Sequence, residues 1–255
     1  MSGTFNAKGE LEPSAAAIIL CVGKKGSGKT VMVLLIASAW PYDMVVVDVA
    51  GDDGPLARKP GSGSHDVVEI TGPVDELPRQ WPEHLRREKR PMILRYVPDP
   101  GSPTELEDMD AMVGLAYSHS STERPCMLVI HEIGRAAPAG RTPPHMRRVL
   151  NHSRHRGLTG AFAGPRPQTV DPLIVAQATI LFGYAMVDLA AISFLGLGVQ
   201  PPEPNWGVMI SENQVGIPQG YPLPALVACA CIVVVVIAVN VLGERLFEQA
   251  QRTHR

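Results

Sequence analysis

The chain has 255 residues, of which 45% are hydrophobic and 19% charged, and its formal net charge is −2. This composition excludes a disordered chain and a strongly basic nucleic-acid-binding tail. Charge is nevertheless unevenly distributed, because residues 173–255 hold only three basic and five acidic side chains, which leaves 20 of each in residues 1–172. The first two-thirds therefore has the composition of a soluble domain, whereas the last third has too few charges for one.

Residues 1–172 alternate short apolar runs with helical stretches. The runs that have the length and apolar content of buried strands are 15–22, 44–49, 66–71, 92–97, 126–130 and 158–163. Helical composition occurs between them at 30–40, 83–89 and 105–117. Alternation of strands and helices is typical of a parallel sheet covered by helices. The sequence therefore predicts an α/β domain in this part of the chain.

Two long apolar runs follow this part. Residues 173–199 carry a single formal charge, Asp188, and residues 223–242 carry none. A bilayer core of about 30 Å is crossed by about 20 apolar residues in a helix. We therefore predict a transmembrane α-helical hairpin, with the Pro-rich segment 200–222 as the loop between its spans. A buried helix of a soluble protein is the alternative.

The distribution of basic residues predicts the orientation of this hairpin. The loop 200–222 has no Lys or Arg, whereas five arginines lie between residues 147 and 166 and three follow the second span. Because positive residues stay on the cytoplasmic side, we expect the loop outside and both termini inside, as in a multi-pass protein of the inner (plasma) membrane. Residues 1–14 lack the apolar core of a secretory signal, which agrees with a cytoplasmic start.

A glycine-rich loop separates the first predicted strand from the first predicted helix. Residues 23–30 read GKKGSGKT and fit the GxxxxGK[ST] (Walker A) pattern at every defined position. In such a loop, backbone N–H groups and a helix N-terminus bind phosphate, the lysine reaches the β- and γ-phosphates, and the hydroxyl holds Mg²⁺. We therefore predict binding of ATP and Mg²⁺, with a structural Gly-rich turn as the alternative. The expected nucleotide contacts are Gly23, Lys24, Lys25, Gly26, Ser27, Gly28, Lys29 and Thr30.

An acidic group should complete the magnesium site. The strand 126–130 ends in His131 and Glu132. P-loop ATPases usually have Asp-Glu at this place, where the Asp holds magnesium through water and the Glu polarises the attacking water. Glu132 is present as a candidate catalytic residue with Lys29, but an imidazole at His131 cannot replace a carboxylate in a hard-oxygen shell. Asp48, at the end of the strand 44–49, is a second candidate for magnesium. We expect hydrolysis to suffer more than binding.

Arginines are concentrated in a segment without carboxylates. Between Gly134 and Val170 there are seven arginines and no Asp or Glu. Such a segment can be a solvated basic face attracted to anionic lipid headgroups. It can equally contact phosphate, in a nucleic-acid backbone or in the nucleotide of a neighbouring copy. The arginines singled out for phosphate or nucleic-acid contact are Arg154, Arg156 and Arg166.

Residues 15 to about 180 resemble the FtsK/HerA-type branch of P-loop ATPases, especially phage and plasmid versions. The resemblance is carried by GKKGSGKT at 23–30, CMLVIHEIGR at 126–135, and RHRGL at 154–158 followed by RPQ at 166–168. It implies a RecA-like fold and ATP-driven translocation of nucleic acid. The chain departs from the family pattern at His131, at Ser153 in place of a Gly and at Pro165 in place of a Gln, and it lacks the family's final strands.

Residues 172–255 resemble the C-terminal end of dipeptide/oligopeptide-type ABC transporter permeases. The segments AISFLGLGVQPPEPNWGVMISE at 191–212 and NVLGERLFEQA at 240–250 carry this resemblance. It implies an integral membrane importer subunit with the same topology that the charges predict. Only the last two helices of that family are present, and the cytoplasmic coupling loop is missing.

Three functional hypotheses follow for a chain divided into a P-loop ATPase-like domain, 1–172, and a permease-like membrane region, 173–255. The first is a membrane-anchored ATPase, a nucleic-acid translocation motor with impaired hydrolysis. The second is a component of a peptide-type permease, and the third is an inactive fusion or truncation product. The partners implied are membrane lipid, further copies in a homo-oligomer, and either DNA or other transporter subunits.

Overall fold

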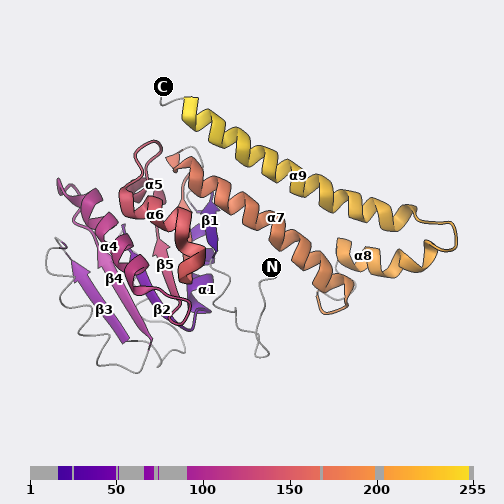
Figure 1. Cartoon of the computed structure of the whole chain (residues 1–255), viewed down its shortest axis with the longest axis horizontal. Helices are drawn as coiled ribbons and strands as arrows, with labels where there is room; N and C mark the ends of the chain where they lie inside the picture. Colours follow the sequence, from indigo (N-terminus) through magenta and orange to yellow (C-terminus); the bar gives the residue numbers. More distant parts are fainter. Residues whose placement is uncertain are drawn as a thin grey trace.

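A computed structural model describes residues 17–24, 26–49, 51, 66–71, 74, 91–166, 169–198 and 204–252. In this part of the chain a sheet domain is followed by a long helical hairpin (Figure 1). The strands are β1 (Ile18–Val22), β2 (Asp43–Val47), β3 (Asp66–Thr71), β4 (Met92–Val97), β5 (Cys126–Ile130) and β6 (Leu158–Gly164). The predicted α/β fold and the following apolar helices are confirmed, while the helix predicted at 83–89 lies outside the described residues.

The sheet is parallel throughout and has the strand order β1-β6-β5-β2-β4-β3. Central strands of such a sheet are covered on both faces, so they are expected to be apolar without alternation. All five residues of β5 and all seven of β6 are buried accordingly. β1 is an edge strand and has β6 as its neighbour.

Helices cover the two faces of the sheet unequally. α1 packs on one face through Val33 and Ala37, together with Trp40 from the following turn. The other face forms the larger core, in which Tyr96 and Phe162 are among the biggest buried side chains. The helices on or next to that face are α4 (Glu105–His119), α5 (Ile133–Ala136), α6 (Pro144–His152), the 3₁₀ turn η2 (Ser153–Arg156) and the start of α7 (Pro172–Phe194).

The hairpin begins inside the sheet domain. Asp171 caps α7 by accepting a hydrogen bond from the Leu173 N–H at 2.8 Å, and Pro172 occupies the first turn, where its missing N–H costs nothing. Ile174 and Val175 are then buried, and Ile174 belongs to the larger core. The boundary between 172 and 173 therefore stays a prediction, because the first turns of the apolar helix also complete the core of the sheet domain.

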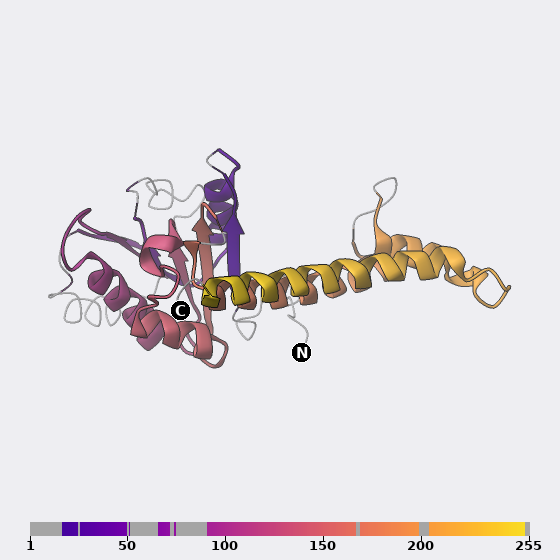
Figure 2. The ribbon, with the colours of Figure 1, turned by 90° about the horizontal axis from the view of Figure 1, so that it is seen from above.

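Beyond these turns, α7 leaves the sheet and pairs with α9 (Leu223–Arg252), which returns toward the sheet domain (Figure 2). Gly183 of α7 lies against Val236 and Asn240 of α9, and Gly243 lies against Thr179. A short helix, α8 (Trp206–Asn213), and the 3₁₀ turn η4 (Gln214–Gly216) lie at the far end, where the sequence predicted only a loop. Asn205 caps α8 by accepting from the Gly207 N–H at 2.8 Å.

Two helices of the described chain are long and apolar enough to cross a membrane, Pro172–Phe194 and Leu223–Arg245. Only 17% and 11% of their apolar windows are buried, which disfavours the alternative of a buried helix in a soluble core. The first span is predicted at 173–199, whereas α7 ends at Phe194. The part of α7 with an exposed apolar surface is shorter still, because Ile180 is the first large apolar side chain of α7 that is exposed.

Candidate functional site

The predicted phosphate loop lies between β1 and α1 (Lys29–Ser38), which confirms the strand–loop–helix order. Gly26 and Gly28 both have φ of 81°, a left-handed conformation that glycine adopts without steric cost. Gly28 is also the N-cap of α1, and its carbonyl accepts the Met32 N–H at 2.9 Å. No side chain caps α1 among the described residues, and an uncapped helix N-terminus is a place where proteins can bind anions.

Contacts within the loop keep it compact. The Gly23 N–H donates to the Gly164 carbonyl at 3.4 Å, which joins the loop to the end of β6. A Cβ on Gly23 would lie only 2.5 Å from the Ser27 Oγ, so a larger residue would force the Ser27 hydroxyl to move. Lys29 donates from its Nζ to the Lys24 carbonyl at 3.1 Å, which holds the ammonium group over the loop. Thr30 is exposed, and Lys25 lies outside the described residues.

Parallel strands bring other predicted residues to the same edge of the sheet. Gly164 pairs with Val22 and Phe162 with Ile130, so the residues after β6 and β5 lie next to the loop in that order. Arg166 follows β6, and Glu132 follows β5 with β6 between it and β1. Two strand spacings amount to about 10 Å. The carboxyl edge therefore gathers the loop, Arg166 and Glu132, as expected for a ligand site of an α/β sheet.

Glu132 has an unusual backbone. Its φ of 57° and ψ of 49° make it the one non-glycine residue with positive φ in the part of the chain that the structure describes. Such conformations cost about 1–3 kcal/mol and are concentrated at functional sites. The strain turns the chain from β5 into α5 and leaves the Glu132 side chain exposed at the carboxyl edge.

His131 lies beside Glu132 but is turned inward, with only 6% of its surface exposed. The backbone N–H of His131 donates to the Val47 carbonyl at 3.4 Å, which continues the β5–β2 ladder beyond the strands. Because Val47 pairs with Ile130, Asp48 and His131 are neighbours at the strand ends. The two residues predicted to complete or to weaken the magnesium site are thus adjacent.

Asp48 is fully buried in an ion pair that the sequence did not reveal. The Arg95 Nη2 and Nε donate to Asp48 Oδ2 at 2.5 and 3.1 Å, and the Arg95 Nη1 donates to Glu69 Oε2 at 2.7 Å. Burial by itself lowers the pKa of Arg95, but the hydrogen bonds and charges of Asp48 and Glu69 raise it above its ordinary value. Asp48 therefore has a structural role, and its contact with magnesium stays a prediction.

The three arginines predicted to contact phosphate are separated by the length of β6. Arg154 and Arg156 precede the strand in η2, whereas Arg166 follows it. Seven strand residues span about 20 Å, so the first two lie at the edge of the sheet opposite the phosphate loop. Arg156 packs over the Tyr117 ring, 4.9 Å from its centroid, and donates to the Ser120 carbonyl at 3.5 Å. Arg166 alone of the three is near the loop of its own chain.

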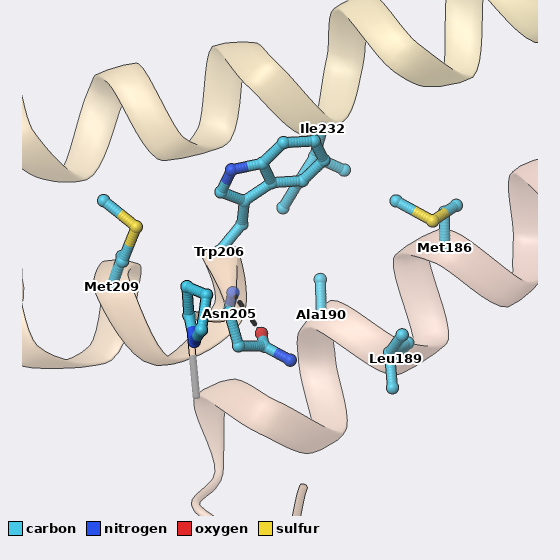
Figure 3. Close-up of a pocket in the computed structure, with 9 residues that line it drawn as sticks. Met186, Leu189, Ala190, Asn205, Trp206, Met209 and Ile232 are labelled. Carbon is cyan, nitrogen blue, oxygen red and sulfur yellow. Dashed lines mark hydrogen bonds between the residues drawn. The ribbon is translucent and has the colours of Figure 1, made fainter. Parts of the chain in front are cut away.

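A separate cavity lies in the hairpin, far along the chain from the phosphate loop. It has a volume of about 310 Å³ and is mostly apolar. Trp206 points toward Ile232 of α9, and Met186, Leu189 and Ala190 of α7 form the opposite side (Figure 3). The side-chain oxygen of Asn205 accepts a hydrogen bond from the backbone N–H of Gly207. Nothing in this lining matches the phosphate chemistry of the loop.

Comparison with known proteins identifies relatives of the C-terminal part. Residues 169–253 match the family of binding-protein-dependent transport system inner membrane components. The di/tripeptide permease DppC of Pseudomonas aeruginosa is 42% identical over 80 residues, and the dipeptide permease DppC of Escherichia coli K12 is 39% identical over 80. The glutathione permease GsiD of Salmonella typhimurium is also 39% identical over 80 residues. These alignments cover 31% of this chain and 26% of each relative.

Solved structures similar to the chain include the genome packaging NTPase B204 from Sulfolobus turreted icosahedral virus 2. Its complex with AMP has a TM-score of 0.45 at 16% identity and covers 66% of this chain and 74% of that chain. Its complex with ATP-gammaS has a TM-score of 0.46 at 17% identity and covers 66% and 73%. Among these comparisons, the sequence likeness lies in the hairpin, whose resemblance to peptide-type permeases is confirmed over about a quarter of their length.

Proposed function

We propose that the sheet domain binds ATP with Mg²⁺ while the hairpin anchors it in the inner membrane. The observation that carries the proposal is the loop 23–28, in which left-handed Gly26 and Gly28 lead into an uncapped helix start beside Lys29. Lys29 would neutralise the β- and γ-phosphates, and the Thr30 hydroxyl would ligate magnesium. The remaining contacts would come from the loop amides of residues 23–28.

Catalysis would depend on Glu132, which is exposed at the same edge and would polarise the attacking water. Slow hydrolysis is expected for two reasons. His131 supplies no carboxylate, and Asp48 would have to share its oxygens between magnesium and Arg95. Binding needs neither group, because the loop and Lys29 provide the phosphate contacts. The domain would therefore hold ATP better than it hydrolyses it.

The placement of the arginines favours a role for partners. Arg154 and Arg156 lie too far from the loop of their own chain to reach its nucleotide, so they would contact the nucleotide of a neighbouring copy or the backbone of DNA. Arg166 would contact phosphate in its own chain. Translocation of nucleic acid by a homo-oligomer is the form of activity that such an arrangement would serve.

The decisive experiment is nucleotide binding by the full chain in detergent or nanodiscs, measured with a fluorescent ATP analogue. Lys29→Ala should weaken binding by about 100-fold, because it removes a charge-assisted contact to two phosphates. Arg124→Ala, at an exposed position after α4, is the matched control and should leave the affinity unchanged. Unchanged affinity in Lys29→Ala would refute the phosphate loop. Equal loss in Arg124→Ala would point to damage of the fold.

A second candidate function is that of a peptide-permease component, which is favoured by the 80-residue match in the hairpin. Two helices cannot enclose a path for a peptide, and the match spans 26% of the permeases, so transport would require other subunits. Chemical crosslinking of the full chain in native membranes, followed by mass spectrometry, tests this proposal. Crosslinks from residues 204–217 to a peptide permease would support it, and crosslinks only between copies of this chain would contradict it.

A further inference from the structure

Exposed apolar side chains of the sheet domain are concentrated on one helix and its strand. In the described chain before residue 172, five large apolar residues are exposed, and all of them except Val67 lie on β1 or α1. Val31, Met32 and Leu35 are 59%, 53% and 60% exposed, which is as open as the lipid-facing residues of α9. Val22, at the end of β1, is 41% exposed. The face formed by Val31, Met32 and Leu35 is called the α1 apolar face below.

This face lies at the end of the domain from which the hairpin extends. β1 is the edge strand of the sheet, α7 packs along it, and α1 covers β1 and β6. Both views place α1 and β1 at the hairpin end of the domain, while β3, with Val67, lies at the opposite end (Figures 1 and 2). Ile180, where α7 first exposes an apolar side chain to its surroundings, follows directly after the turns that pack in the core. The exposed apolar residues of α1 and the start of the hairpin thus lie at the same end of the domain, on either side of the edge strand β1.

The charges around the α1 apolar face suit an anionic bilayer surface. Residues 13–42 contain three lysines and no Asp or Glu, and Lys24 is exposed. Apolar side chains flanked by lysines are the composition with which helices lie in the headgroup region. A water-facing helix of the same length would instead present charged side chains on this side.

We propose that the α1 apolar face rests on the cytoplasmic leaflet of the bilayer, with Val31, Met32 and Leu35 in the headgroup region. The proposal rests on the membrane insertion of the hairpin in the proposed function. It goes beyond that function because it makes α1 a second, peripheral membrane contact. Since Val31 directly follows Thr30, the contact borders the phosphate loop and holds the open side of the loop at a fixed height above the lipid.

The test uses nitroxide spin labels on the full chain in phosphatidylcholine/phosphatidylglycerol nanodiscs. Cys21, Cys229 and Cys231 are replaced by alanine, and Cys126 stays because it is fully buried. Single cysteines are then placed by Met32→Cys, Val67→Cys or Val234→Cys. Collisions with O₂, which concentrates in the bilayer, are compared with collisions with a water-soluble nickel chelate. Val67 is the aqueous control, and Val234, which is 63% exposed on α9, reports insertion of the hairpin.

We expect the O₂-to-nickel ratio at Met32 to be several-fold higher than at Val67 and lower than at Val234. Adding Leu35→Glu should reduce the ratio at Met32 several-fold and leave Val234 unchanged. A ratio at Met32 equal to that at Val67 would overturn the proposal, since the face would then be in water. Low collision with both reagents would also overturn it, because protein, such as a second copy, would cover the face. A low ratio at Val234 would overturn the insertion itself and the docking with it.

Discussion

The sheet domain and the hairpin use similar apolar residues but place them in opposite ways. β5 is apolar and completely buried, whereas α9 exposes most of its valines and isoleucines and packs through small residues such as Ala225 and Ala228. The sheet domain also buries a charged pair, Asp48–Arg95, among its apolar side chains. The kind of apolar residue therefore does not separate the two regions, although their charge content does. What distinguishes them is the solvent that each surface suits, water for the one and lipid for the other.

The largest expected effect tests the apolar exterior of the hairpin. The full chain should stay in the membrane pellet after carbonate and high-salt washes. The double variant Val234→Arg/Ile237→Arg should move to the wash, because each arginine costs about 2.5–3.5 kcal/mol at a span centre. Both positions are exposed on α9, so the variant leaves the interior of the hairpin intact. Val67→Arg on β3 is the matched control and should stay in the pellet; extraction of the unmodified chain would contradict the membrane assignment.

Topology can be tested on the same preparation. A cysteine at Asn213 should react with an impermeant maleimide added outside intact cells, and one at Gln251 should react only after lysis. The reason is that the segment between the spans has no Lys or Arg, while residues 245, 252 and 255 are arginines. Reaction at Gln251 alone in intact cells would show that the hairpin has the opposite orientation, with the phosphate loop on the side where ATP is absent.

The next effect concerns the charged pair inside the sheet domain. Arg95→Met leaves Asp48 buried without its main partner and should lower the free energy of unfolding by about 3–5 kcal/mol. Arg135→Met removes a pair with Glu105 in which the arginine side chain is 44% exposed, so it should cost less than about 1 kcal/mol. Urea unfolding of the full chain in detergent, followed by near-ultraviolet circular dichroism, measures both. Equal losses in the two variants would mean that burial does not determine how much an ion pair contributes to the free energy of unfolding.

A smaller effect is expected at the carboxyl edge. His131→Asp places a carboxylate beside Asp48 and should increase Mg²⁺-dependent ATP hydrolysis by on the order of tenfold. The gain should disappear when Glu132→Gln is added, because the water would lose its general base. Phosphate release measures all three chains. No gain in His131→Asp, together with a brisk rate in the unmodified chain, would remove His131 as the cause of slow hydrolysis.

The smallest effect tests the interior of the hairpin. A Cβ at Gly243 would lie 2.5 Å from the Thr179 Oγ1, whereas one at Gly183 would lie 3.4 Å from Val236. Gly243→Ala should therefore destabilise the α7–α9 pair by about 1–3 kcal/mol, and Gly183→Ala should change it little. Thermal unfolding of the helical signal in detergent compares them. A greater loss in Gly183→Ala would show that the helices pair in another register.

Much of the sheet domain could be predicted from its pattern. The strands 66–71, 92–97 and 126–130 begin and end where the apolar runs do, and the phosphate loop follows β1 as its spacing requires. Local pattern carries no information on strand order, so the place of Glu132 two strands away from β1 could not be predicted. Arg154, Arg156 and Arg166 are grouped by charge alone in the sequence, although the length of β6 separates the first two from the loop. Arg95 was missed because an arginine inside an apolar run gives no sign of its partner. Asn205 before Trp206 was the one local signal for α8, since Asn is a favoured N-cap.

The unbroken course of α7 couples the geometry of the two regions. One helix runs from Ile174 in the sheet core to Phe194 at the far end of the hairpin. Its single glycine, Gly183, does not interrupt it. Because each residue of a helix turns the chain by about 100°, a one-residue insertion after Thr179 would rotate the outer hairpin by that angle relative to the sheet. The number of residues in α7 thus sets the angle between the phosphate loop and the exposed apolar side of the hairpin, and short insertions or deletions there would change this angle in steps of about 100°.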